Sequence, residues 1–335
     1  MNKVVKGIII AAVAAAVGAA AFFLNRSVDE VDETTQNDVL IDDRKNTTLP
    51  EGLEVFAADG SRPALWKVTS SDGKTLYVSG AIHSMPHNVY PVSDEVKKAF
   101  DACDSVAVEI KSVDIADIFI GKDVPRFSPE LPEGDELKNH LAPDIYSHLE
   151  DYLSQHGGSI DDVKGYYPYY VSNNLYAFVT DAPTSKAQGK YGFDYIIQVL
   201  ANIDEKPIYS IETQEAKARY YPEMPEESAG YMLDYELKTT YDEEKIFSDW
   251  CAGDVDGIFD IYYSKDGLTD EQLAVREKYV QYCITDRNYI MKTKAEEYLS
   301  SGKTTFLVVG ICHLSGDEGV PALLEKDGYS VERIL

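Results

Sequence analysis

The chain has 335 residues, of which 44% are hydrophobic, and it carries a formal net charge of −27. A chain of this length and apolar content can bury a packed core, which excludes a small disulfide-dense scaffold. The acidic excess argues against binding to nucleic acid and against docking on anionic lipid headgroups.

An uncharged apolar segment lies at the start of the chain. Residues 7–24 span roughly 27 Å as a helix, which is close to the thickness of a bilayer core. Lys3 and Lys6 precede this segment and an acidic stretch follows it, so residues 1–25 are predicted to be a single-pass anchor at the cell membrane. The N-terminus would be cytoplasmic and the remainder extracytoplasmic. The alternative is a cleaved secretory signal, which would give a secreted protein.

The rest of the chain divides into a tether and one domain. Residues 26–62 are polar and acidic without apolar periodicity, which is typical of a flexible tether. Residues 63–335 are expected to form the folded domain. Within it, residues from about 137 to 301 follow a mostly helical pattern, and we expect this insertion to cover the ends of the strands.

The domain begins with a pattern of strands around a helix. The apolar segments 65–68 and 76–82 are separated by Asp72-Gly73, which predicts a hairpin. A helix from Ser93 to about Cys103 and a strand over 105–108 follow. Because a strand–helix–strand unit usually gives parallel neighbours, the strands on either side of this helix are expected to be adjacent.

The helical pattern between the two halves of the sheet predicts three longer helices. The first runs from Leu137 to Leu149, the second opens at Gly192, and the third continues to Ile290. Their expected N-terminal caps are Asp135, Asp194, and either Thr269 or Asp270.

Four apolar runs each end on a residue that can bind a metal, namely His83, Glu109, Glu212 and His313. Runs of this kind are typical of strands buried on both faces, so the sequence predicts an α/β fold, with α+β as the alternative, built on a mixed, largely parallel sheet. Ligands bind at the carboxyl ends of such strands. Two imidazoles and two carboxylates at that edge would form a site for a divalent cation.

Each of these residues also has a purely structural interpretation. His83 could be an edge histidine bonded to a carbonyl, and Glu109 could be a buried carboxylate paired with Arg287. Glu212 could be a strand-end charge that faces solvent. Cys312 is expected to be a buried, unreactive thiol.

Other motifs of catalysis are missing from the sequence. It contains no G-x-S-x-G, no H-E-x-x-H, no Walker loop and no dinucleotide glycine fingerprint. Its four cysteines show no C-x-x-C spacing, which excludes a zinc ribbon and a thioredoxin-type motif.

Several short motifs together resemble the TraB/PrgY/GumN family. They are Leu65-Trp66-Lys67-Val68, the run from Tyr77 to His83, Tyr90-Pro91, Val108-Glu109, Leu131-Pro132-Glu133-Gly134, Gly192-Phe193-Asp194, Ile211-Glu212-Thr213, Asp286-Arg287-Asn288 and Val309-Gly310-Ile311-Cys312-His313-Leu314. The resemblance covers about residues 63–335. Ala81 departs from the family pattern, in which a threonine is common. The family includes the Tiki proteases, and its fold is similar to that of erythromycin esterases and of haem-binding ChaN-type proteins.

The resemblance implies a metal-dependent, peptidase-like site. Two Gly-x-x-His motifs supply His83 and His313, the strand end supplies Glu109, and Arg287 and Asn288 occupy the Arg-Asn motif of the family. We expect the histidines to hold Mn²⁺, Co²⁺, Zn²⁺ or Fe²⁺, with Glu109 as a further ligand or as general base.

The expected function is therefore that of a membrane-anchored, extracytoplasmic metallohydrolase acting on a peptide or protein. In this hypothesis Arg287 binds the developing oxyanion or a substrate carboxylate, and Glu212 is a ligand or supports one. Two alternatives stay open: a non-catalytic protein that binds a pheromone-like peptide, and a haem or iron binder on the same fold.

Overall fold

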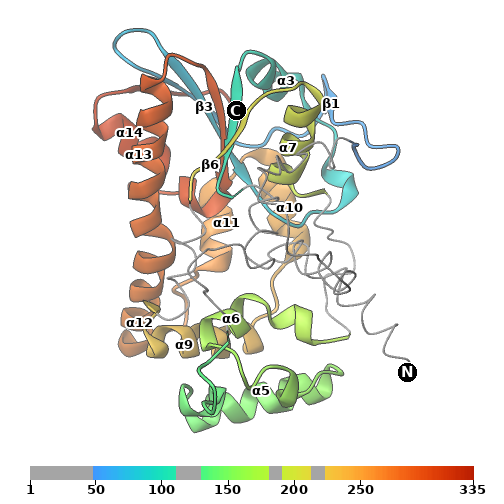
Figure 1. Ribbon diagram of the computed structural model, residues 1–335, viewed down its shortest axis with the longest axis vertical. Coiled ribbons are helices and arrows are strands. Elements are labelled where there is room, and N and C mark those ends of the chain that lie inside the picture. Colours follow the sequence, from blue (N-terminus) through green and yellow to red (C-terminus); the bar gives the residue numbers. More distant parts are fainter. Residues whose placement is uncertain (1–47, 111–129, 181–190, 213–222) are drawn as a thin grey trace, which may run out of the picture.

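The computed structural model describes residues 48–110, 130–180, 191–212 and 223–335. Its elements are numbered as in Figure 1. The strands are β1 (Phe56–Ala57), β2 (Leu65–Thr69), β3 (Thr75–Ala81), β4 (Val92–Ser93), β5 (Ser105–Val108), β6 (Ile208–Ser210), β7 (Thr305–Gly310) and β8 (Ser330–Arg333). The α-helices are α3 (Asp94–Asp101), α5 (Pro143–Gln155), α6 (Pro168–Asn173), α7 (Phe193–Ile203), α9 (Glu226–Lys238), α10 (Glu243–Ala252), α11 (Val255–Tyr262), α12 (Asp270–Val280), α13 (Asp286–Ser300) and α14 (Val320–Lys326).

Short helical turns complete the list of elements. A π-helical turn, η8 (Gln281–Thr285), joins α12 to α13. The 3₁₀ turns are η3 (His87–Val89), η4 (Leu137–Asn139), η5 (Ile160–Asp162), η6 (Leu175–Phe178) and η9 (Ile311–Leu314).

The main sheet has six strands in the order β6-β5-β7-β3-β2-β8. The pairs β6–β5, β5–β7 and β7–β3 are parallel, whereas β2 pairs antiparallel with both β3 and β8. The fold is therefore a mixed α/β fold whose sheet is parallel over the four strands that end near the candidate site. The hairpin predicted at Asp72-Gly73 is confirmed, since β2 and β3 are antiparallel and Gly73 has a φ of +84°.

The predicted adjacency of the strands before His83 and Glu109 is wrong, because β7 lies between β3 and β5. Residues 305–309 of β7 are all buried, and a strand without a polar face is most stable at the centre of a sheet covered on both sides. The consequence is that His313, which follows β7, lies between the other two residues.

Two further expectations are corrected. The helix expected from Leu137 to Leu149 is divided into η4 and α5, because Pro143 disfavours a helical conformation in the residue before it. The strand before Glu212 is not buried on both faces: β6 is an edge strand, and Tyr209 is 38% exposed. The other predicted helices form, and Thr269 caps α12 through a capping box.

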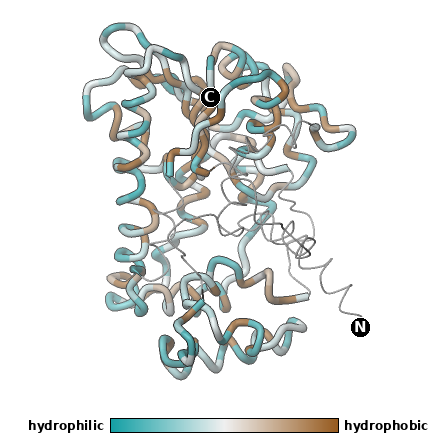
Figure 2. The backbone as a smooth tube through the Cα atoms, viewed as in Figure 1, coloured by the Kyte–Doolittle hydropathy of each residue, from teal (hydrophilic) through white to brown (hydrophobic). Residues whose placement is uncertain are grey.

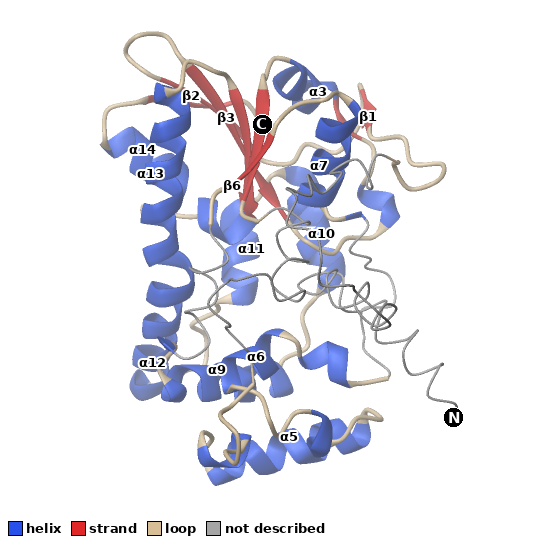
Figure 3. Cartoon of the chain, viewed as in Figure 1, coloured by secondary structure: helices blue, strands red, loops and turns tan. Residues whose placement is uncertain are grey.

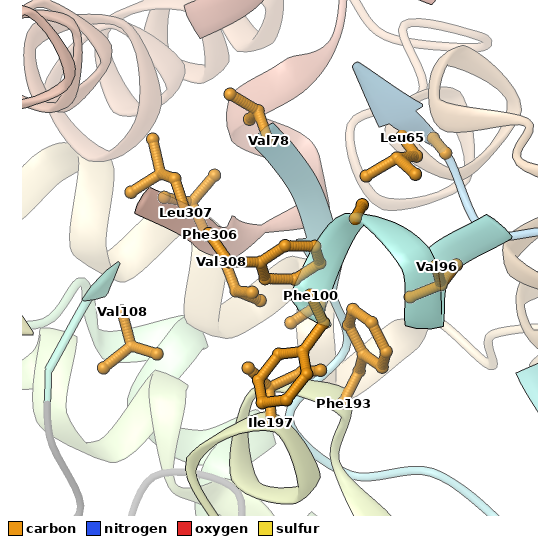
Figure 4. Packing of buried hydrophobic residues seen from close by; sticks show 14 of the residues in the cluster. Leu65, Val78, Val96, Phe100, Val108, Phe193, Ile197, Phe306, Leu307 and Val308 are labelled. Atoms are coloured by element: carbon orange, nitrogen blue, oxygen red, sulfur yellow. The ribbon is translucent and has the colours of Figure 1, made fainter. Parts of the chain in front are cut away.

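Helices cover both faces of the sheet, as Figures 1 and 3 show. α7 packs against β3, β5 and β6, while α13 and α14 lie on the opposite face. In the core, the ring of Phe100 from α3 meets Phe306 of β7 edge to face at 6.0 Å, and Phe193 lies close by (Figure 4). Leu53 and Val55 are buried in this core, so the folded region begins before Pro63, the predicted boundary.

The helical region has a hydrophobic core of its own. α5, α6 and α9 enclose buried residues such as Leu149, Val171 and Leu233, which form a cluster separate from the core around the sheet. These helices lie on the side of the sheet to which the carboxyl ends of the parallel strands point (Figure 1). In Figure 2 hydrophobic residues concentrate in the strands, and hydrophilic residues line the surrounding loops.

No helix within the described ranges is long and apolar enough to cross a membrane. The predicted anchor over residues 1–25, and the predicted tether up to residue 47, lie outside the described residues.

Candidate functional site

Four strand ends deliver the predicted site residues to one edge of the sheet. His83 follows β3, Glu109 follows β5, Glu212 follows β6, and His313 follows β7 through the turn η9. Three of them are buried, with relative exposures of 7% for Glu109, 2% for Glu212 and 3% for His313. The side chain of His83 is 40% exposed, so the site reaches the surface on the β3 side.

Gly310 lies at the point where His83, Glu109 and His313 converge. A Cβ atom at this position would be 2.8 Å from Glu109 Oε1, 3.4 Å from His313 Cδ2 and 3.8 Å from His83 Nε2. The amide of Gly310 donates a hydrogen bond to Glu109 Oε1, and His313 Nε2 lies 3.7 Å from the same oxygen. A glycine is required here because any side chain would fill the space that these three groups share.

Arg287 joins the two glutamates. Its Nη2 donates to Glu109 Oε2 at 2.7 Å and to Glu212 Oε2 at 2.8 Å, while Nε donates to Glu212 Oε1 at 2.6 Å. The structural interpretation of Glu109 as a buried carboxylate paired with Arg287 is thus confirmed. Glu212 does not face solvent, because it is 2% exposed and both of its carboxylate oxygens accept from Arg287.

These contacts stabilise the charged form of the Arg287 guanidinium. Burial alone would lower the pKa of the guanidinium, but the carboxylates of Glu212 and Glu109 outweigh it and raise the pKa well above its ordinary value. Arg287 therefore keeps its positive charge beside the two carboxylates. Its predicted role in binding an oxyanion stays a prediction.

The π-helical turn η8 precedes Arg287 and Asn288 directly. Asp286 closes this turn by donating its amide hydrogen to the carbonyl of Gln281, and the carbonyl of Cys283 accepts from Arg287 Nη1 at 3.1 Å. A π-turn changes the helical phase of the residues that follow, and such turns are frequent at functional sites. This turn could not be predicted from the sequence, since the apolar pattern continues through it without a break.

Asn288 orients His313 from α13. Asn288 Nδ2 donates to the carbonyl of Glu318 at 2.7 Å, which leaves Oδ1 to accept from His313 Nδ1 at 2.6 Å. Nδ1 therefore carries the proton of the neutral ring, and Nε2 is the nitrogen with a lone pair. Asn288 is 1% exposed, so this arrangement is enclosed in protein.

Asp194 does the same for His83, and this role was missed from the sequence. We expected Asp194 to cap its helix, but α7 has no side-chain cap, and Asp194 Oδ2 instead lies 3.1 Å from His83 Nδ1. A carboxylate can only accept here, so the proton of the neutral ring is again on Nδ1. The sequence feature that could have indicated this role of Asp194 is the motif Gly192-Phe193-Asp194, which also contributes to the family resemblance.

The four cysteines are free and unsuited to nucleophilic chemistry at the site. Burial raises the pKa of Cys312 to about 12 and that of Cys283 to about 11, which keeps both as thiols at neutral pH. Cys283 contacts the hydroxyl of Tyr169 at 3.7 Å, so α6 of the helical region touches the turn that precedes Arg287. The neighbouring Tyr166 and Tyr170 pack on each other at 4.9 Å, as ordinary core packing predicts.

The donor set is suited to a divalent cation. Two imidazoles whose Nδ1 atoms are held by oxygens, together with one carboxylate, are typical ligands for a first-row metal, and the space over Gly310 is where all three meet. In the described part of the chain no three His, Cys, Asp or Glu side chains are drawn together closely enough to form a finished metal centre. The residues present are of the types that bind a divalent metal, and their side chains lie around the same position over Gly310.

The chain matches the model of one known protein family. The model of the TraB/PrgY/gumN family matches residues 64–333, which is most of the chain. No curated protein and no solved structure gives a match. The family resemblance stated from the motifs is confirmed.

Proposed function

We propose that this chain, which belongs to the TraB/PrgY/gumN family, is a membrane-anchored, extracytoplasmic, metal-dependent hydrolase that acts on peptides. The observation that carries the proposal is the convergence of His83, Glu109 and His313 on Gly310 from three different strands. Residues separated by some two hundred positions do not gather around a bare glycine for packing alone, because two imidazoles and a carboxylate contribute little to a hydrophobic core.

In this proposal His83 and His313 hold the cation through Nε2, and Glu109 lies beside them. A bound divalent metal would supply a water molecule whose pKa is lowered to near 7. Asp194 and Asn288 fix the two rings so that both Nε2 atoms keep their lone pairs.

Glu109 is the candidate general base. Arg287 holds its Oε2, so Oε1 is the oxygen that faces the histidines and can take a proton from a water molecule. Glu212 makes no such approach. Its bidentate contact with Arg287 keeps the guanidinium in place, so Glu212 helps to position Glu109 indirectly, through Arg287.

The cellular placement rests on the sequence. Residues 7–24 have the length and apolarity of a membrane span, and the basic residues before them favour a cytoplasmic N-terminus. The chain is expected in the membrane fraction, and deletion of residues 1–25 is expected to release it. Recovery of the wild-type chain from the medium with a shortened N-terminus would overturn the anchor.

The test of the activity is cleavage of a random peptide library by the full-length chain. We expect cleavage that a chelator abolishes, that Mn²⁺, Co²⁺, Zn²⁺ or Fe²⁺ restores, and that Glu109→Gln removes. Lys294→Gln, at an exposed pair elsewhere on α13, serves as the control that should keep it. Cleavage that persists after chelation or in the E109Q variant would contradict the proposal.

A further inference from the structure

A second recess lies on the other side of Asn288. It has a volume of about 470 Å³, is open to solvent, and is lined by the end of α11, by the continuous helix α12–η8–α13, and by the loop after His313. The helix lines it with Arg276, Val280, Ile284 and Asn288, a spacing of four residues that keeps them on one face. A recess of this size is in the range of sites that bind small ligands.

The recess is elongated along the helix. Twelve positions separate Arg276 from Asn288, and at about 1.5 Å per residue they span roughly 18 Å. Phe259 and Tyr263 of the α11 end form the opposite apolar wall. An extended peptide advances about 3.3–3.6 Å per residue, so a chain of roughly four or five residues would fill this length.

The two ends of the recess carry opposite charge. Lys265 and Arg276 line one end, whereas Asp317 and Glu318 line the end next to Asn288, whose side chain donates to the carbonyl of Glu318. Glu277 also lines the cationic end. It lies 3.5 Å from Lys265 and pairs with that residue. Arg276 is left as the cation of that end.

Arg276 makes no direct ion pair with any residue that the structure describes. It is only 1% exposed, and among the described residues no carboxylate lies within ion-pairing distance of it. Its Nε is buried without a hydrogen-bond partner, whereas Nη1 donates to the carbonyl of Ser264 at 3.0 Å and Nη2 to the hydroxyl of Tyr231 at 3.5 Å. The guanidinium also lies 4.1 Å from the Tyr235 ring. Buried charges are normally paired, so this guanidinium lacks the counter-charge that its environment calls for.

The nearby buried carboxyl does not fill that role. Burial raises the pKa of Glu236 by more than the charge of Arg276 lowers it, and its Oε1 accepts a hydrogen bond from Tyr241 at 2.6 Å. Glu236 makes no direct ion pair with Arg276, so a bound anion would give this guanidinium the contact that the described residues do not supply.

We propose that this recess binds a short peptide of about four or five residues by its two charged ends. The C-terminal carboxylate pairs with Arg276, the apolar side chains lie against Val280 and Ile284, and the N-terminal ammonium lies near Asp317 and Glu318. The inference rests on the proposed function in that it names the class of peptide this protein handles. A peptide in the recess touches Asn288 and so contacts the residue that orients His313.

The experiment measures peptide retention by the full-length chain after metal removal. The probe is a random mixture of tetrapeptides and pentapeptides with free carboxyl ends, compared with the same mixture as C-terminal amides, in equilibrium dialysis read by mass spectrometry. We expect the free acids to be retained at least tenfold more than the amides, because only they supply a carboxylate for Arg276.

Three variants decide the location. Arg276→Gln should reduce retention of the acids to that of the amides, and Val280→Trp should reduce it by filling the recess while Arg276 stays charged. Lys278→Gln removes an equal charge from the same helix outside the recess and should change nothing. If Arg276→Gln fails to fold, as thermal unfolding would show, Val280→Trp decides alone.

Equal retention of acids and amides by the wild type would overturn the inference, and so would wild-type retention by both recess variants. The outcome is separable from that of the proposed function. His313→Ala should lose metal and keep peptide retention, whereas Val280→Trp should lose retention and keep metal.

Discussion

The edge of the sheet and the α5–α9 face use charged side chains in opposite ways. At the sheet edge Arg287 pairs with Glu109 and Glu212, which lie 178 and 75 positions away in the sequence, and none of the three side chains is more than 13% exposed. On the α5–α9 face His148 and Lys238 both contact Asp234, and the histidine and the lysine are largely exposed. Exposed pairs contribute little to stability, whereas a buried cluster is unstable unless every charge in it is matched. The sheet edge is therefore the region where single substitutions should have large effects.

The largest expected effect is that of Arg287→Gln. It leaves two buried carboxylates without their cation, and we expect the free energy of unfolding to fall by about 3–5 kcal/mol. Denaturant titration of the wild type and the variant measures this. Lys294→Gln, which breaks an exposed pair on the same helix, is the matched control and should change stability by less than about 1 kcal/mol. Similar losses in the two variants would contradict the larger effect expected for the buried cluster.

Gly310→Ala tests the shared space at the sheet edge directly. The new methyl group would lie 2.8 Å from Glu109 Oε1, so the carboxylate must shift, and we expect a loss of about 1–3 kcal/mol together with weaker metal binding. Gly165→Ala in the helical region is the control, because a Cβ there meets nothing within 4 Å. An unchanged metal affinity in G310A would show that the three groups do not share a ligand.

Asn288→Ala and Asp194→Ala remove the groups that orient the two histidines without removing a proposed ligand. We expect each to weaken metal affinity by about 10–100-fold, since outer partners of metal-binding histidines have effects of this size. Titration with Zn²⁺ measures it, and Gln281→Ala, which breaks an exposed hydrogen bond to Asp286, is the control. Wild-type affinity in both orienting variants would mean that the rings do not bind metal through Nε2.

The smallest expected effect lies at the α5–α9 face and depends on pH. Partial burial alone would lower the pKa of His140, but hydrogen bonds to Glu226 and Asp135 outweigh it and the pKa is raised. Because the folded pKa exceeds the unfolded value of about 6.5, the stabilisation is complete below that pH and is lost as pH rises through the folded pKa. His140→Gln should therefore lose stability at pH 6, by less than about 1 kcal/mol, and approach the wild type at pH 9. A constant difference across this range would contradict the assignment.

The sequence predicted which residues gather at the site better than it predicted how they are arranged. Apolar runs that end on His83, Glu109 and His313 show that these side chains lie at strand ends, because run length and composition are local properties. The order of the strands is not local. It depends on which strand is most stable at the centre, so the position of β7 between β3 and β5 became visible only in the structure.

The parts that were missed depend on contacts between distant segments. Asp194 lies in the first turn of α7, where a cap is the usual expectation, and only the packing of α7 against β3 turns it toward His83. The π-turn before Arg287 leaves no mark on the apolar pattern, since it changes helical phase by one residue. Likewise the Nε atom of Arg276 lacks a hydrogen-bond partner because of the residues around it, and no spacing in the sequence reveals this.

The most direct measurement is the metal content of the full-length chain purified without added metal, beside His83→Ala and His313→Ala prepared in the same way. The proposed site predicts a bound first-row metal in the wild type and its loss in both variants, with folding preserved by thermal unfolding. Equal metal in all three proteins would show that the imidazoles at this sheet edge do not hold a shared ion.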